Sequence, residues 1–204
     1  MKFTEPFGFW AIKPDGERAY QAYEHVHSYC EGASIQYARV YSLWQQSSNI
    51  KDAGDVVAVA RAKRAHMQQV VRDIHCLLVF LQVIWKTLQV ISDPNLYPNF
   101  KAVALLRDKW QDYFEQYRAA RNTLEHYEDQ VLGDDSKGNS PGWGLSLSGA
   151  GVFSLGTQQA VSINQAAHDQ FRLFINEFEQ AMAVIVGPVP PPGDGGTDVA
   201  GQAA

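Results

Sequence analysis

Arg121, Asn122 and His126 are the residues of this chain whose types and spacing are best suited to chemistry. A histidine has a pKa near neutrality, so its imidazole can take a proton from a hydroxyl group at physiological pH. The planar guanidinium of an arginine matches phosphate oxygens and can stabilise negative charge that develops there. An Arg–His pair therefore suits metal-free RNA cleavage, in which the substrate's 2′-hydroxyl attacks the neighbouring phosphate.

The spacing of Arg121 and His126 leaves two interpretations open. Five residues of a regular α-helix turn through about 140°, so the two side chains share one site only through a bend or a partner protomer. In the second interpretation, Arg121 pairs with Glu125 at i,i+4, His126 lies on a solvated face, and neither residue is catalytic. The spacing alone does not decide between these two interpretations.

Four segments with apolar residues at alternating steps of three and four must position these residues. Such a pattern is typical of bundle helices. We predict helices near 17–47, 55–92, 99–132 and 162–186, the last starting at the capping-box spacing of Ser162 and Gln165. The short first connections favour antiparallel neighbours. The residues predicted to be buried in the core are Leu77, Leu81, Ile84, Trp110, Leu124 and Phe174.

The third connection is longer and carries its own pattern. Apolar residues alternate with small ones over 143–156, on both sides of a Ser148–Gly151 turn, which predicts a β-hairpin laid against the bundle. From Gly187 onward proline and glycine dominate, so we predict a disordered tail over 187–204. The fold class is therefore all-α: a single domain over 1–186, forming an antiparallel up-down four-helix bundle with a small β-hairpin inserted between helices three and four.

A helical bundle with Arg121, Asn122 and His126 late in its third helix resembles the HEPN superfamily, many of whose members cut RNA without a metal. The resemblance implies that these three residues are the catalytic set. It also implies a homodimer, because two HEPN protomers usually bring their Arg–His sets to one cleft. A bacterial-type RNase or toxin, with an RNA substrate and an antitoxin-like protein partner, is the function that follows. The alternative is a non-catalytic helical module that binds a protein.

Basic residues gather early in the second predicted helix. Arg61 and Arg64, together with Arg118 on the third helix, are the residues expected to contact RNA. The neighbouring Lys63, His66 and Arg72 extend the same stripe. A solvated helix face is the competing interpretation of these charges.

Tyrosines at helical spacing are a second unusual feature. Four on the first helix and three on the third are expected to meet in the interior: Tyr20, Tyr23, Tyr37, Tyr41, Tyr113, Tyr117 and Tyr127. Buried hydroxyl groups need hydrogen-bond partners. The interior is therefore either a satisfied polar core or the lining of a ligand cavity.

Composition limits the remaining classes of function. The 204 residues are 46% hydrophobic and 19% charged, with a net charge of −5, which argues against a protein that coats nucleic acid. Glu24 and His27 have the Glu-x-x-His spacing of di-iron helices, but no second copy exists, so we expect neither a metal nor another cofactor. The start lacks a signal-peptide pattern and Cys30 and Cys76 fall on predicted core faces, so we expect a cytoplasmic protein without membrane association.

Overall fold

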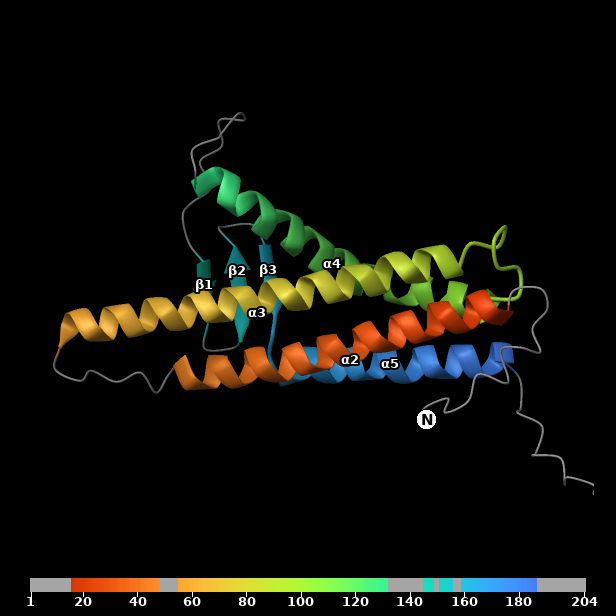
Figure 1. The fold of residues 1–204 in the computed structure, drawn as a ribbon, viewed down its shortest axis with the longest axis horizontal. Helices are drawn as coiled ribbons and strands as arrows, with labels where there is room; N and C mark the ends of the chain where they lie inside the picture. The colour runs from red at the N-terminus through yellow and green to blue at the C-terminus, as the bar shows by residue number, and fades with distance from the viewer. Residues whose placement is uncertain (1–15, 48–54, 132–144, 149–150, 156–158, 187–204) are drawn as a thin grey trace, which may run out of the picture.

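The computed structural model describes residues 16–47, 55–131, 145–148, 151–155 and 159–186. Within these ranges lie four helices, α2 (Gly16–Ser47), α3 (Val56–Ile91), α4 (Lys101–Val131) and α5 (Gln165–Val186). They alternate in direction, as predicted for an up-down bundle (Figure 1). The tail over 187–204, predicted to be disordered, lies outside the described residues.

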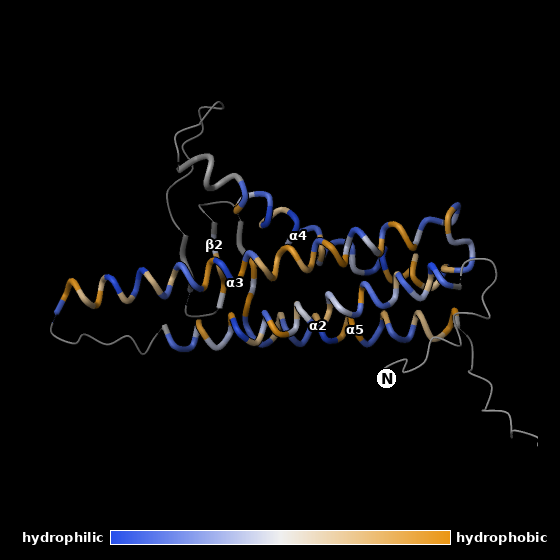
Figure 2. Tube along the Cα trace, viewed as in Figure 1, coloured by the Kyte–Doolittle hydropathy of each residue, from blue (hydrophilic) through white to orange (hydrophobic). Residues whose placement is uncertain are grey.

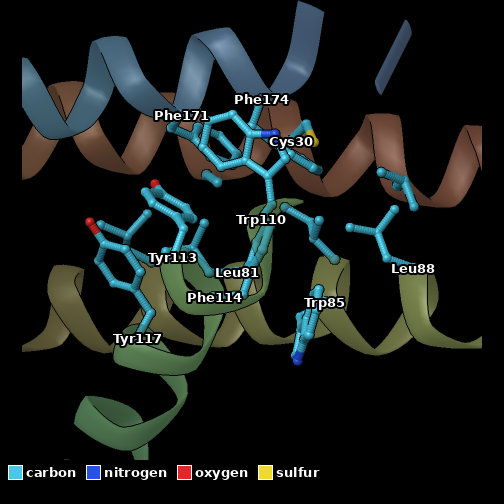
Figure 3. Packing of buried hydrophobic residues seen from close by; sticks show 14 of the residues in the cluster. Cys30, Leu81, Trp85, Leu88, Trp110, Tyr113, Phe114, Tyr117, Phe171 and Phe174 are labelled. Carbon is cyan, nitrogen blue, oxygen red and sulfur yellow. The ribbon is translucent and has the colours of Figure 1, made fainter. Parts of the chain in front are cut away.

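The bundle core follows the heptad pattern of α3 and α4. All six side chains predicted to be buried are in the core: Leu77, Leu81, Ile84, Trp110, Leu124 and Phe174. Aromatic rings from α3, α4 and α5 fill much of the volume between the helices (Figure 3). The helix α3 starts where the Asp55 carboxylate accepts hydrogen bonds from the backbone N–H groups of Val57 and Ala58.

The core face of α2 differs in part from the prediction. Tyr23, Cys30 and Tyr37 are buried as predicted, but Tyr20 and Tyr41 are only half-buried. The other buried positions of this face are Ala19, Val26, Ala33 and Val40. Small side chains let α2 approach α3 closely: a Cβ atom added at Gly32 would stand 3.0 Å from the Phe80 ring.

Cys76 corrects a second detail of the sequence-based interpretation. Cys30 is buried in the core, whereas Cys76 on α3 is exposed. The reason is angular, because Cys76 lies between the core residues Ile74 and Leu77 and two residues of helix rotate a side chain through about 200°. Both cysteines are free thiols.

The predicted hairpin is present and is extended by a third strand. Strands β1 (Leu145–Leu147) and β2 (Val152–Leu155) pair antiparallel, and β3 (Gln159–Ser162) pairs with β2. The Gly151 N–H donates to the Ser148 carbonyl to close the turn, and Gly151 has a φ of 70°, which glycine adopts without strain. The sheet lies against α4, and Phe153 and Val161 are buried beneath it. The hairpin is therefore docked on the bundle as predicted.

The start of α5 was predicted three residues too early. Ser162 belongs to β3, and the capping residue is Asn164, whose Oδ1 accepts a hydrogen bond from the Ala167 N–H at 3.0 Å. The Ile163 N–H donates to the Gly151 carbonyl, so the sheet takes the residues that the capping-box pattern assigned to the helix. A side chain two residues further on performs the same capping role.

One helix of the described part, α3, is long and apolar enough to cross a membrane by length and composition alone. Inside the structure, 44% of that apolar window is buried. The core helix of a helical bundle can be equally long and apolar, and the heptad pattern of α3 is typical of such a core helix.

Candidate functional site

The residues predicted to be catalytic lie near the end of α4. The Arg121 side chain is mostly buried and its Nη2 donates to the Glu125 carboxylate, as in the non-catalytic interpretation. Asn122 is half-buried beside it. The backbone of His126 belongs to α4, but its side chain lies outside the described residues.

The path of α4 sets the angle between the two positions. The helix is continuous to Val131, so the backbone positions of Arg121 and His126 are about 140° apart around its axis. A regular helix therefore does not place the two positions on one face.

Arg121 has one unusual feature. Its Nε atom is buried and has no hydrogen-bond partner in the described part of the protein. Burying a polar N–H without a partner costs about 1–3 kcal/mol, so native structures rarely do it without a reason. A bound anion that accepts from Nε would remove this cost.

Arg121 lies where α4 leaves α3. The Trp85 indole of α3 stacks on Phe114 of α4, with ring centroids 5.3 Å apart, and its Nε1 donates to Glu115 at 3.3 Å (Figure 3). Beyond this contact the C-terminal half of α4 diverges from α3 (Figure 1). Arg121 follows Phe114 by one heptad, so it occupies the same side of α4, at the start of the divergence.

A groove of about 480 Å³ lies on α3 itself. The described residues that line it are Arg64, Met67, Gln68, Val71 and Arg72. Val71 precedes Trp85 by two heptads and therefore lies on the side of α3 that faces α4 further along the helix. The groove thus has an apolar floor between two arginines.

The three residues predicted to contact RNA are placed differently. Arg61 is exposed, and Arg64 is an exposed residue at the groove. Arg118 is exposed on α4 and its Nε donates to the Glu115 carboxylate at 2.5 Å. Arg61 and Arg64 thus share α3, whereas Arg118 is already engaged with an acid on its own helix.

A hydrogen-bonded network that the sequence did not reveal holds Arg72. The buried Asp73 carboxylate accepts from Arg39 Nε of α2 and from Gln69 Nε2, both at 2.9 Å. The Gln69 Oε1 in turn accepts from Arg72 Nη2 at 2.8 Å. The one signal in the sequence was an aspartate directly before the core position Ile74.

The tyrosine-rich interior is a satisfied core. Tyr37 Oη donates to Tyr117 Oη at 2.9 Å, and Tyr117 Oη donates to the Ser162 carbonyl at 3.3 Å. The Tyr37 hydroxyl has only one proton, so Tyr113 must be the donor in its 3.0 Å contact with Tyr37. Each of the three hydroxyls therefore has an acceptor, as the polar-core interpretation required.

The pKa values of these phenols agree with a structural role. Burial raises the pKa of Tyr37, Tyr113 and Tyr117 above the ordinary value, because the charged phenolate would lose its hydration. All three remain protonated at neutral pH and donate hydrogen bonds.

No cluster of three or more His, Cys, Asp or Glu side chains that could hold a metal occurs in the described ranges. The best approach to one is at His27, whose ring nitrogens lie 3.9 Å from Glu31 of α2 and from Glu179 of α5. Glu24 does not join His27 in such a cluster among the described residues.

No protein-family model, curated protein or solved structure matches this chain.

Proposed function

We propose that the protein is a HEPN-like, metal-independent endoribonuclease that acts as a symmetric homodimer. Arg121 of each protomer binds the scissile phosphate and His126 is the general base. The 2′-hydroxyl loses its proton to His126 and its oxygen attacks phosphorus. The bond from phosphorus to the 5′-oxygen breaks, and this oxygen takes a proton from water. The products are a 2′,3′-cyclic phosphate and a 5′-hydroxyl end.

The observation that carries this proposal is the buried Nε–H of Arg121, which lacks a partner in the described part of the chain. The Glu125 carboxylate accepts from Nη2 and holds the guanidinium in place, so the Nε–H is left without an acceptor, which a phosphate oxygen would supply. Asn122 is next to it and can donate a second hydrogen bond.

The geometry of α4 supports the dimer. The backbone positions of Arg121 and His126 are about 140° apart around a continuous helix, so they do not share one face of it. A two-fold axis brings equivalent surfaces of two protomers together, so it can place the two sets at one cleft. Analytical sedimentation of the protein should show a dimer. A protein concentration of roughly tens of micromolar is high enough to reveal weak association. A strict monomer would remove the composite site.

Cleavage of a structured RNA in the presence and absence of EDTA tests the activity. We expect cleavage in EDTA, with 2′,3′-cyclic phosphate ends. His126→Ala should lower the rate by about 100-fold or more, as for loss of a general base. Arg121→Lys should lower it by about 100-fold, because an ammonium group does not reproduce the planar contact with phosphate.

Matched substitutions outside the site provide the controls. His25 and Arg18 are exposed residues of α2, so His25→Ala and Arg18→Lys should leave the cleavage rate unchanged. Cleavage that requires a divalent metal, or that survives His126→Ala, would contradict the proposal.

A non-catalytic protein-interaction module is the second candidate. The observation that favours it is the groove on α3, whose apolar floor suits a protein better than it suits RNA. In this function, Arg121 serves only to pair with Glu125, and the purified protein leaves RNA intact.

A further inference from the structure

One side of α3 carries a row of residues that is exposed at the start of the helix and buried further along it. Val57, Arg64, Val71, Leu78 and Trp85 are spaced by seven and therefore lie on one side of α3. Leu78 and Trp85 are 1% and 3% exposed, because the bundle covers them. Val57, in contrast, is 58% exposed. The same row is thus a core contact at one end and a bare surface at the other.

The bare part has the composition of a helix-docking surface. Ala60 and Met67 follow Val57 and Arg64 by three residues, which completes a three–four spacing from Val57 to Val71. The groove of about 480 Å³ lies on this part of the helix. Figure 1 shows this end of α3 extending beyond α2 and away from α4, and Figure 2 shows hydrophobic and hydrophilic residues alternating along it.

The charges on this part of α3 all have one sign. Residues 56–72 contain no aspartate or glutamate, but they contain Arg61, Lys63, Arg64 and Arg72. The chain as a whole has a net charge of −5, so this local excess of positive charge is opposite to the average. Two copies of this surface would repel each other, whereas an acidic partner would be attracted.

One of these arginines is held in place before any ligand arrives. Arg72 donates to Gln69, Gln69 donates to the buried Asp73, and Asp73 also accepts from Arg39. An arginine that is already positioned loses less side-chain entropy when it binds a carboxylate.

We propose that the first half of α3 is the docking surface for an acidic amphipathic helix of a partner protein. The apolar residues of that helix pack on Met67 and Val71, and acidic residues flanking them pair with Arg64 and Arg72. Arg64 and Arg72 are eight residues apart, about 12 Å along the axis, which matches acidic residues two turns apart on the partner helix. The proposal does not require RNA cleavage.

A designed peptide provides the test. The probe is a fluorescein-labelled peptide of about three heptads with leucine at positions a and d and glutamate at e and g, used below the concentration at which it self-associates. Fluorescence anisotropy should show saturable binding to the full chain. A peptide with lysine in place of glutamate should not bind, nor should an acidic peptide of the same composition in scrambled order.

Variants of α3 locate the binding surface. Arg61→Glu combined with Arg64→Glu should raise the Kd at least about tenfold, and Met67→Asp should do the same. Lys86→Glu is the matched control, because Lys86 is an exposed cation on the same helix outside the groove, and it should change the Kd by less than about twofold.

Three outcomes would overturn the proposal. The first is binding of the scrambled peptide as tight as that of the ordered one, which would identify a surface that attracts any polyanion. The second is binding of the peptide to the variants as tight as to the parent protein. The third is no binding of the peptide but binding of a single-stranded RNA that depends on Arg61 and Arg64, which would make the surface an RNA contact. None of these results depends on whether the protein cleaves RNA.

Discussion

The two halves of α4 have opposite characters. In the N-terminal half, the buried Trp110 indole has a partner, because its Nε1 donates to Glu177 of α5 at 2.8 Å. In the C-terminal half, the buried Arg121 Nε lacks one among the described residues. The N-terminal, closed half thus satisfies its buried donor, whereas the C-terminal, diverging half leaves one unsatisfied.

The bundle core should tolerate no charge. We expect Leu81→Asp on α3 to unfold the protein, because an unpaired carboxylate in the core costs several kcal/mol. Circular dichroism during thermal unfolding measures the effect. Leu105 is 72% exposed on α4, so Leu105→Asp should change the free energy of unfolding by less than about 0.5 kcal/mol. A helical, cooperatively folded Leu81→Asp variant would contradict this placement.

The hydrogen bonds among the hydroxyls of Tyr37, Tyr113 and Tyr117 should make a smaller but measurable contribution to the free energy of unfolding. Tyr37→Phe leaves the Tyr113 hydroxyl without its acceptor and removes the proton donated to Tyr117. We expect a loss of about 1–3 kcal/mol in urea unfolding, as for a buried polar group left unsatisfied. Tyr41→Phe on the half-buried edge of α2 is the control and should be nearly neutral. Equal stability of the two variants would mean that the chain contributes nothing.

A substitution in the diverging half should affect RNA binding more than it affects stability. Arg121→Met removes an i,i+4 ion pair with a partly exposed glutamate, and such pairs contribute only about 0.3–0.5 kcal/mol. It also removes the buried Nε that lacks a partner. Stability should therefore change by less than about 1 kcal/mol, whereas RNA binding should be lost. A large loss of stability would instead make Arg121 a structural residue.

The smallest effect is a pH dependence at the boundary between the sheet and α5. Burial lowers the pKa of His168, whose ring stacks on Tyr37 at 5.5 Å, and the Arg172 charge lowers it further. The unfolded chain therefore binds the proton more readily, so stability is complete above a pH of about 6.5 and falls as the pH decreases toward the folded pKa. His168→Gln should flatten this part of the stability profile, whereas His25→Gln should leave it unchanged. An identical slope in parent and His168→Gln would exclude this contribution.

The sequence predicted those features that depend on periodicity within one segment. The repeat from Val70 to Ile91 specified the buried face of α3, and the small residues around Ser148–Gly151 specified the turn. It failed where a neighbouring element decided the outcome. Ser162 has the spacing of a helix cap, but pairing with Val152 places it in a strand.

In the candidate site too, contacts within one helix could be predicted from the sequence, whereas contacts between helices could not. The i,i+4 spacing of Arg121 and Glu125 offered the ion pair as one of two interpretations, and the structure contains that pair. The buried Arg121 Nε and the Arg39–Asp73 contact depend on how helices pack across the bundle. Spacing within one helix contains no information about these contacts.

The proposed function depends on the Arg121 Nε–H of the diverging half binding a phosphate. Nuclear magnetic resonance can follow this N–H, with its signal assigned by its absence in Arg121→Lys. A 2′-O-methyl RNA, which lacks the attacking hydroxyl and so cannot be cut, is added to the parent protein. As RNA binds, we expect the Arg121 Nε–H signal to shift and to exchange more slowly with water. RNA binding that shifts the signals of Arg61 and Arg64 but leaves that of Arg121 unchanged would exclude this role of Arg121.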